Sequence, residues 1–408
     1  MRFFKDLTKE QISIQIFIFC KAVVAGLVLM GVNSSFFGML YEHGINLKSM
    51  SIIPIAAAPY GFKFLLSPYI KNLICVRNFS LTALVRIVQI TVFILFSTLG
   101  FVTDNMLIAT LNVFLLTLSI SIYDIIVTHI KLMSFDSNQF GMVTAFTTVG
   151  FRIGMLFGGG GLAYLAYYLG WKVGFSLLAG ILILINMALT PHFINICESK
   201  NPDYEKQSGS KQLFTLIKNF IISSGSIGVI LLILSVKFPD ISLHTTKQMF
   251  LLFKGFDKIQ IANISQIPGV LAMIIGGLVG GVATYKLAVN KCMSFSLAFF
   301  ASSCSLFYWL SCRSLGIWTT AFILTISSFS CGFLNVVFRT FVDKYSHKDV
   351  NKNVLLISLG SLLKLIFANL SLLIANNNNW GLLYMLCVLS TIPGIVICFK
   401  SRWLKDLG

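Results

Sequence analysis

The sequence has little charge and very few acidic residues. Only 11% of its 408 residues are charged, and 14 Asp and Glu stand against 31 Lys and Arg. A soluble domain carries about 25% charged residues, so this chain cannot cover a water-facing surface of its size. That scarcity excludes a soluble enzyme and a disordered chain. We expect the basic excess to lie in loops beside a membrane and not to bind nucleic acid.

Histidine and paired cysteine are scarce as well. The five histidines lie far apart and form no His-Glu-x-x-His motif, and no Gly-x-Ser-x-Gly motif is present. The nine cysteines include no Cys-x-x-Cys pair and lie mostly in apolar runs, as is typical of small buried hydrophobic residues. These absences exclude a secreted disulfide scaffold. They predict a protein that is not an enzyme and that holds no metal and no cofactor.

Long apolar runs dominate what is present. Hydrophobic residues make up 56% of the chain, and the mean hydropathy is +0.86. At about 20 apolar residues per helical span, this length accommodates about twelve spans. We therefore predict an all-α integral membrane protein in a lipid bilayer. The expected spans are 12–35, 46–70, 79–102, 106–133, 140–168, 172–194, 219–246, 259–285, 292–311, 315–343, 352–375 and 380–399.

Lysine and arginine indicate the orientation. With both ends of the chain in the cytoplasm, the inner segments carry about three times as many Lys and Arg as the outer ones, which satisfies the positive-inside rule. The stretch ESKNPDYEKQSGSK at 198–211 is the longest charged linker. It predicts two six-helix halves, 1–194 and 219–408, joined by a cytoplasmic linker over 195–218. Two such halves indicate a duplicated transporter with the twelve-helix major facilitator fold.

Seven cations fall inside the expected spans, where an ionisable side chain is costly unless it faces a cavity or a partner. Only two acids, Asp124 and Asp240, lie comparably deep. An excess of cations predicts a cavity for an anionic substrate. Snorkelling to the surface and structural ion pairing are the alternatives. The seven cations are Lys21, Lys63, Arg86, Arg152, Lys237, Arg339 and Lys364.

Asp124 is the candidate for proton coupling, because a carboxylate in a low-dielectric cavity can load and release a proton. Thr128 and Lys131 follow at i+4 and i+7 on the same helical face. The alternative is a structural salt bridge from Asp124 to Arg152 or Lys131. A structural pair of this kind could still act as a gate.

Small residues recur at helical spacing in two spans. Gly150, Gly154 and Gly158 lie four residues apart in span five, and Gly276 and Gly280 do the same in span eight. This spacing lets helices approach closely. Since spans five and eight face each other across the halves of the facilitator fold, we expect these glycines to form a smooth contact there. Ordinary tight packing without motion is the alternative.

Several motifs occur together and in order along most of the chain. The fifth-span motif, with Gly, an aromatic residue, Arg and a Gly-rich run closing in Gly-Trp, is the most specific. Together they resemble the AmpG-type muropeptide permeases, a branch of the major facilitators. The motifs are PYGFKFLLSP at 59–68, GFRIGMLFGGGGLAYLAYYLGW at 150–171, VKFPD at 236–240, GVLAMIIGGLVGG at 269–281, VLLISLGSLLK at 354–364 and WGLLYMLCVLSTIPG at 380–394.

The resemblance implies import of anhydro-muropeptides, the anionic disaccharide-peptide fragments of peptidoglycan turnover, into the cytoplasm. It implies a monomer in the bacterial inner membrane that is a symporter driven by the proton gradient. Carried over onto this chain, it assigns proton coupling to Asp124 and Asp240. The residues that it assigns to substrate binding are Lys63, Arg152, Lys237 and Lys364.

Three departures from the family pattern leave alternatives open. Thr128 stands where the family has a second acid in span four, Lys71-Asn72 replaces an Asp-Arg pair, and no acid lies near Ser327 in span ten. A transporter of another anionic metabolite, such as acetyl-coenzyme A or a nucleotide, is one alternative. A degenerate permease that no longer transports is the other.

Overall fold

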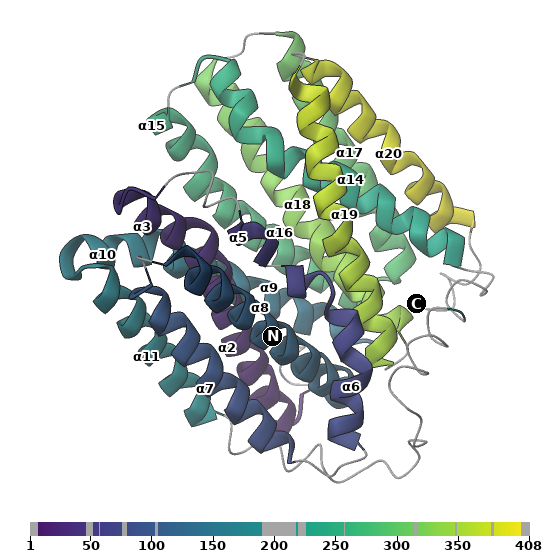
Figure 1. The fold of residues 1–408 in the computed structure, drawn as a ribbon. Helices are drawn as coiled ribbons and strands as arrows, with labels where there is room; N and C mark the ends of the chain where they lie inside the picture. Colours follow the sequence, from purple (N-terminus) through teal and green to yellow (C-terminus); the bar gives the residue numbers. More distant parts are fainter. Residues whose placement is uncertain are drawn as a thin grey trace. The chain divides into compact units, whose positions relative to one another are not determined.

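Every secondary-structure element that the structure describes is a helix (Figure 1). The structure is a computed structural model, and the prediction of an all-α membrane fold is confirmed in it. Apart from Lys218, the expected linker 195–218 lies outside the described residues. The described residues are 7–45, 52–56, 58–75, 80–102, 105–189, 218, 226–256, 258–313, 316–346, 349–376 and 379–400.

The chain forms two compact units, and two of its helices continue from one unit into the other. Unit 1 comprises Met1–Asp136, Phe146–Leu216 and Lys348–Ser358. Its helices, with three interruptions of π or 3-10 type, are α2 (Lys9–Met30), η1 (Gly31–Phe36), α3 (Phe37–Glu42), α5 (Ile53–Ala56), η2 (Ala58–Tyr60), α6 (Lys63–Cys75), α7 (Leu81–Leu99), α8 (Met106–Ser134), α9 (Phe140–Leu156), η3 (Phe157–Gly161), α10 (Leu162–Leu169) and α11 (Trp171–Leu189). Residues 140–145 of α9 are part of unit 2.

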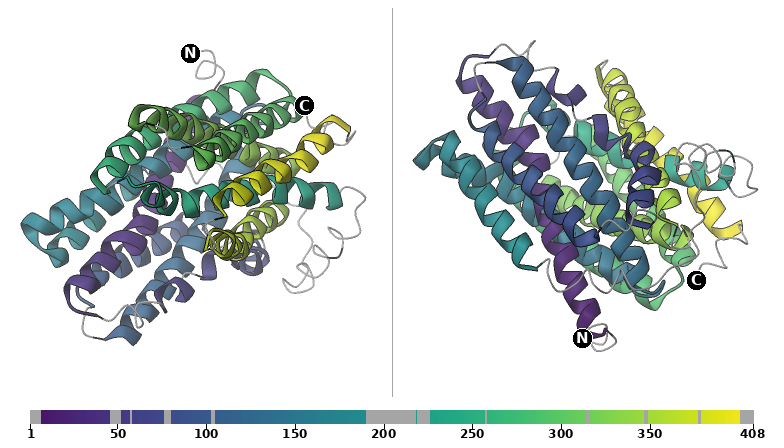
Figure 2. Two further views of the ribbon diagram at one scale, coloured as in Figure 1. Left: turned by 90° about the horizontal axis from the view of Figure 1, so that it is seen from above. Right: turned by 60° about the horizontal axis from the view of Figure 1, so that its bottom comes forward.

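Unit 2 comprises Ser137–Ala145, Ile217–His347 and Leu359–Gly408. In it, α17 packs against α18 and α20, while α16 packs along α18 (Figure 2). The first residues of α19, up to Ser358, belong to unit 1. The helices are α14 (Ser226–Phe253), α15 (Lys258–Ile261), η4 (Ala262–Gln266), α16 (Ile267–Lys286), α17 (Val289–Cys312), α18 (Ile317–Tyr345), α19 (Val350–Asn376) and α20 (Trp380–Lys400).

Local sequence explains where several helices start. Thr8 caps α2 in a reciprocal capping box with Gln11, which satisfies two backbone N–H groups that the helix leaves open. Asn105 caps α8 by accepting from the N–H groups of Leu107 and Ile108 at 3.0 and 3.3 Å. Each cap marks the point where the polar connection ends and the apolar span begins.

Eleven helical segments in the described ranges are long and apolar enough to cross a membrane. The expected second span, 46–70, differs: its described part consists of α5, η2 and α6, and α6 has only 13 residues. Proline lacks the N–H that a helix interior needs, and glycine weakens a helix. Pro54, Pro59 and Gly61 therefore explain why this apolar run does not form one continuous helix.

Unit 1 brings α2 and α9 into backbone contact through glycine. A Cβ on Gly150 would lie 2.7 Å from the Phe19 carbonyl oxygen, and one on Gly154 would collide with the carbonyl of Val23. Gly158 meets Leu27 in the same way. Both series rise by four residues in the same direction, so the two helices run parallel at very short range.

Unit 2 uses the same device between α16 and α18. Gly276 lies against the carbonyl of Phe329, and a Cβ on Gly280 would lie 3.0 Å from the carbonyl oxygen of Phe333. The expected role of these glycines in a contact between spans five and eight is therefore corrected. Each series packs inside its own unit: the series of α9 contacts α2, and the series of α16 contacts α18.

Spans five and eight do meet, but through residues that the sequence did not single out. Gly141 of α9 lies against Thr284 of α16, and a Cβ on Gly281 would lie 2.5 Å from the Cβ of Ala145. All four residues belong to unit 2. The contact thus involves the first turns of α9, before the predicted glycine series begins.

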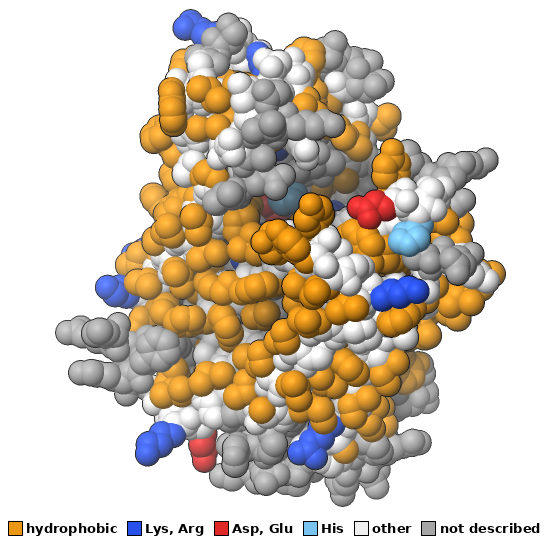
Figure 3. Space-filling view, turned by 90° about the vertical axis from the view of Figure 1, so that its left-hand side faces the viewer, with side chains coloured by type: hydrophobic (Ala, Val, Ile, Leu, Met, Phe, Trp, Pro, Cys, Tyr) orange, Lys and Arg blue, Asp and Glu red, His pale blue; other side chains and the backbone are white. Residues whose placement is uncertain are grey.

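The outer surface is apolar. Large hydrophobic side chains such as Leu107, Leu184 and Trp318 are 75%, 71% and 85% exposed. On the face in Figure 3, hydrophobic side chains cover most of the described surface, and charged ones are few. Exposure on this scale suits acyl chains and not water. Because lipid is as apolar as these side chains, helix association depends on the close packing that glycine allows.

We predict that Gly154→Leu destabilises unit 1, because the new side chain must displace the Val23 carbonyl. The expected loss is about 1–3 kcal/mol of unfolding free energy or more, measured as a lower thermal midpoint of the detergent-solubilised protein. Gly160→Ala is the matched control from the same glycine run, since nothing lies within 4 Å of its Cβ position. An unchanged midpoint for Gly154→Leu would contradict the packing.

Candidate functional site

Two lysine ammonium groups hold the carboxylate of Asp124. Lys21 Nζ binds Oδ1, and Lys63 Nζ lies 2.5 Å from Oδ2. The residues come from α2, α6 and α8, and their exposed fractions are 5% for Lys21, 0% for Lys63 and 9% for Asp124. We call Lys21, Asp124 and Lys63 the ion cluster. It places two positive charges against one negative charge inside unit 1.

The break in the second span positions one member of this cluster. Lys63 is the first residue of α6, directly after the interruption that η2 and Gly61 make. The start of a helix carries partial positive charge from its open N–H groups. Lys63 adds a full charge at that point. The carboxylate of Asp124, well inside the 29-residue helix α8, offsets both.

Aromatic rings flank both lysines. The ammonium of Lys63 lies 4.5 Å from the ring centroid of Tyr60, and that of Lys21 lies 5.9 Å from the ring centroid of Tyr123. A desolvated cation over a π face gains about 2 kcal/mol or more. The rings therefore replace part of the hydration that each lysine loses on burial.

The cluster is stable only while it remains intact. Removing one partner of a buried ion pair typically costs about 3–5 kcal/mol, because the other charge is left without compensation. A second anion that competes for Lys21 or Lys63 would free one oxygen of Asp124. That oxygen could then accept a proton. In this arrangement, Lys21 or Lys63 can exchange the carboxylate of Asp124 for the carboxylate of a bound ligand.

The sequence placed Asp124 correctly in the membrane but did not give it these partners. It offered Arg152 or Lys131 for a salt bridge and treated Lys63 as a free contact for cargo. The sequence identifies Lys21 as an in-span cation without indicating that it binds Asp124. One signal could have found it: Asp124 is the one acid away from the span ends before the linker, so each cation at similar depth was a candidate partner.

Arg152 lies on α9 and has no carboxylate partner among the described residues. Its Nη1 lies 3.3 Å from the sulfur of Met155, a weak acceptor, and its guanidinium lies 6.0 Å from the ring centroid of Phe151. The Nε atom is buried without a hydrogen-bond partner. A guanidinium in this state retains its capacity to bind an anion.

The two predicted residues on α14 in unit 2 are not paired with each other. Asp240 Oδ1 accepts from Cys331 Sγ at 3.1 Å and from Asn335 Nδ2 at 3.3 Å. Lys237 Nζ lies 5.0 Å from the ring centroid of Phe338. Within the part of the chain that the structure describes, neither forms a salt bridge. Lys364 of α19, the remaining predicted contact, is exposed.

Two of the predicted residues therefore meet, Lys63 and Asp124, and they are joined by Lys21. Arg152 shares unit 1 with them, whereas Lys237, Asp240 and Lys364 lie in unit 2. The predicted glycines of α9 pack beside the ion cluster. Gly150 contacts Phe19 and Gly154 contacts Val23, which lie two residues before and after Lys21 in α2. The described residues contain no group of three or more metal-ligating side chains.

Comparison with curated proteins gives relatives over nearly the whole chain. The AmpG 1 protein of Rickettsia conorii, assigned by its name as a transporter, is 25% identical over 403 residues, which covers 93% of this chain and 96% of that protein. AmpG 4 of the same organism is 22% identical, with 93% and 94% covered. AmpG 3 of Rickettsia prowazekii is 23% identical, with 95% and 97% covered.

Comparison with solved structures supports the fold. A bacterial homologue of the iron transporter ferroportin, solved in an outward-facing state, matches with a TM-score of 0.66 at 13% identity, covering 97% of this chain and 99% of that one. No protein-family model matches the chain. The resemblance seen in the motifs is thus confirmed: this chain is a divergent relative of the AmpG-type transporters and has the all-helical fold of a membrane transporter.

Proposed function

We propose that this chain imports anhydro-muropeptides across the bacterial inner membrane into the cytoplasm, in symport with protons. The observation that carries the proposal is the charge balance of unit 1. Of the seven in-span cations, four lie in unit 1, Lys21, Lys63, Arg86 and Arg152, and they accompany one deep carboxylate, Asp124. Such an excess in an apolar medium favours an anion as cargo. The cargo class comes from the AmpG resemblance, and its members carry carboxylates.

Arg152 is the proposed first contact for a cargo carboxylate. Its guanidinium offers several N–H donors in a fixed fork that matches a carboxylate. Among the described residues it has no acidic partner to give up, so binding costs no ion pair seen in the structure. In unit 2, Lys237 and Lys364 are the proposed further contacts. Lys237 lacks an acidic partner in the described ranges, and Lys364 is exposed.

Proton coupling follows from competition inside the ion cluster. A cargo carboxylate attracts Lys21 or Lys63 and leaves Asp124 with one ammonium instead of two. The freed oxygen takes up a proton, so cargo and proton are loaded in the same step. Asp240 is the proposed second proton carrier, since its carboxylate accepts only from a thiol and an amide and is bound to no cation in the described chain.

The membrane setting completes the proposal. The relatives are bacterial, and the excess of Lys and Arg in alternate connections supports an orientation with both ends of the chain in the cytoplasm. We propose that a monomer carries out this import by alternating access, so that its binding site is open to only one side of the membrane at a time. The cargo arrives from the periplasm, where peptidoglycan fragments are released.

We predict that the protein restores uptake of labelled anhydro-disaccharide-peptide in a strain that lacks its own muropeptide permease. Uptake should rise when the external pH falls from 7.5 to 5.5, because a larger inward proton gradient drives symport. An excess of unlabelled anhydro-muropeptide should compete. Competition by acetyl-coenzyme A or a nucleotide instead would replace the cargo, and absence of uptake at both pH values would remove the proposal.

We predict that Arg152→Ala raises the KM for this cargo about tenfold or more, because a charge-assisted contact of about 1.5–3 kcal/mol is lost. Arg152→Lys should recover part of the affinity, since it keeps the charge and loses the fork. Arg86→Ala is the matched control, because Arg86 also lies in a span and is exposed. Equal effects of Arg86→Ala and Arg152→Ala would contradict a specific contact.

We predict that Asp124→Asn abolishes accumulation of cargo against its gradient but retains exchange of cargo for cargo. Asparagine cannot carry the proton, while the cations that attract the anion remain. Counterflow and pH-driven uptake, measured in the same proteoliposomes, separate the two steps. Asp240→Asn is the parallel variant, and full pH-driven accumulation by Asp124→Asn would assign coupling elsewhere.

A further inference from the structure

The residue before Asp124 in the sequence lies against the same lysine. Tyr123 is 1% exposed, and its ring packs edge-on against Phe17, with centroids 6.4 Å apart and planes at 63°. The ammonium of Lys21 lies 5.9 Å from the centroid of the same ring. Phe17 and Lys21 are one helical turn apart on α2. Tyr123 therefore covers the face of α2 from which Lys21 extends.

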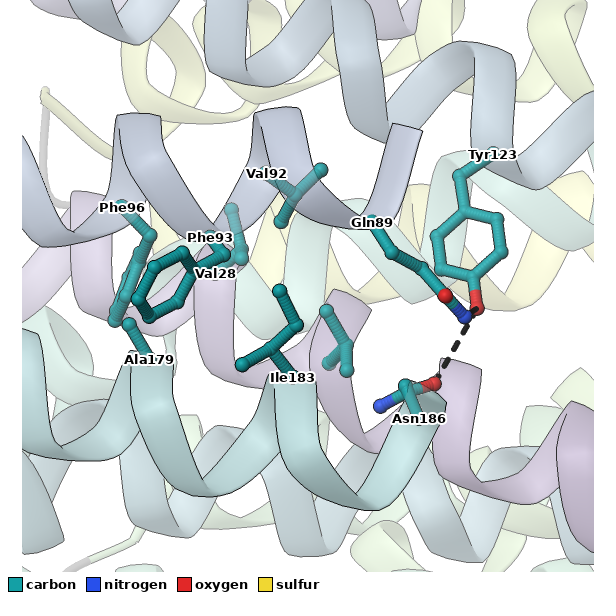
Figure 4. A pocket seen from close by; sticks show the side chains of 10 residues that line it. Val28, Gln89, Val92, Phe93, Phe96, Tyr123, Ala179, Ile183 and Asn186 are labelled. Carbon is teal, nitrogen blue, oxygen red and sulfur yellow. Dashed lines mark hydrogen bonds between the residues drawn. The ribbon is translucent and has the colours of Figure 1, made fainter. Parts of the chain in front are cut away.

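The hydroxyl of Tyr123 joins three helices. It accepts a hydrogen bond from Gln89 Nε2 of α7 at 3.0 Å and donates one to Asn186 Oδ1 of α11 at 3.3 Å. Gln89 is 5% exposed and Asn186 is 2% exposed. Figure 4 shows the three side chains together at one end of a cavity. Both the accepting and the donating capacity of the hydroxyl are thus used.

The cavity beside these side chains is small and otherwise apolar. Its volume is about 20 Å³, and its lining includes Val92, Phe96, Ala179 and Ile183 (Figure 4). A space of this size holds about one water molecule, so it cannot admit a glycopeptide. The hydroxyl lies among buried side chains, where hydrogen bonds are stronger than in water.

Polar side chains inside spans are costly unless they have a use. A phenylalanine at position 123 would bury the same ring and would need neither Gln89 nor Asn186. The chain nevertheless keeps three polar side chains on three spans to fix one hydroxyl. That hydroxyl belongs to the neighbour of the buried acid of unit 1.

We infer that Tyr123 is a positioning residue for the ion cluster. Its hydroxyl, held by α7 and α11, fixes the rotation of α8 and hence the direction in which Asp124 leaves the backbone. Its ring lies against the ammonium of Lys21, which also binds the carboxylate. The role in cargo affinity rests on the proposed function, whereas the geometric role of Tyr123 toward Lys21 does not.

Two variants separate the hydroxyl from the ring. Tyr123→Phe keeps the ring over Lys21 and removes the hydroxyl, while Tyr123→Leu removes both. We expect the KM for labelled anhydro-disaccharide-peptide to rise about threefold and about tenfold respectively, as the hydrogen bonds and then the cation–π contact are lost. Maximal uptake per folded protein should change less than twofold, because the charges themselves remain.

A double-variant cycle distinguishes positioning from general support. In a Lys21→Met background, Tyr123→Leu should raise the KM by a smaller factor than it does alone, because the ammonium that its ring contacts is gone. Tyr167→Phe, the same chemical change at a side chain that is 83% exposed, should leave the KM unchanged. An unchanged KM in Tyr123→Leu, with uptake falling only in proportion to folded protein, would overturn the inference.

Thermal stability tests the positioning role of Tyr123 independently of which cargo the protein carries. The thermal midpoint of the purified protein is measured for Tyr123→Leu, Lys21→Met and the double variant. We expect the double variant to lose less than the sum of the single losses, because both remove one contact. Strictly additive losses would overturn the positioning role, whereas absence of muropeptide uptake with non-additive losses would overturn only the proposed function.

Discussion

A single carboxylate in an apolar medium has to balance cations from two other helices, and much of unit 1 depends on this constraint. Asp124 satisfies it by binding Lys21 through one oxygen and Lys63 through the other. Both lysines are buried, and each lies against the acid and an aromatic ring. The cluster is therefore a structural element for as long as no other anion competes for it.

Two departures from regular helix packing make this arrangement possible. The break at η2 and Gly61 lets α6 begin at Lys63, where a continuous span would place that residue in mid-helix. The glycines of α9 let α2 approach at backbone distance on both sides of Lys21, through Phe19 and Val23. Proline and glycine, which weaken helices, therefore determine where Lys63 and Lys21 lie relative to Asp124.

The sequence predicted well what depends on composition and period. Eleven of the twelve expected spans coincide with described helices long and apolar enough to cross a membrane, and the four-residue spacing of Gly150 and Gly154 predicted a close helix contact. The partners of these residues could not be read in the same way, because a small residue fits against any neighbouring backbone. The same holds for Asp124: its depth followed from the apolar run around it, whereas its choice of Lys21 and Lys63 depends on tertiary packing.

Asp124 and Asp240, the two acids proposed as proton carriers, differ in their partners. Asp124 is bound by ammonium groups, whereas Asp240 accepts from the thiol of Cys331 and the amide of Asn335. Loss of the charge at Asp240 would leave no uncompensated ammonium among the described residues, so protonation there is compatible with the packing around it. In the proposed symport, a cargo carboxylate draws one lysine away before Asp124 takes up a proton, whereas Asp240 needs no such step. The proposal therefore predicts an order of events, with cargo binding before protonation of Asp124.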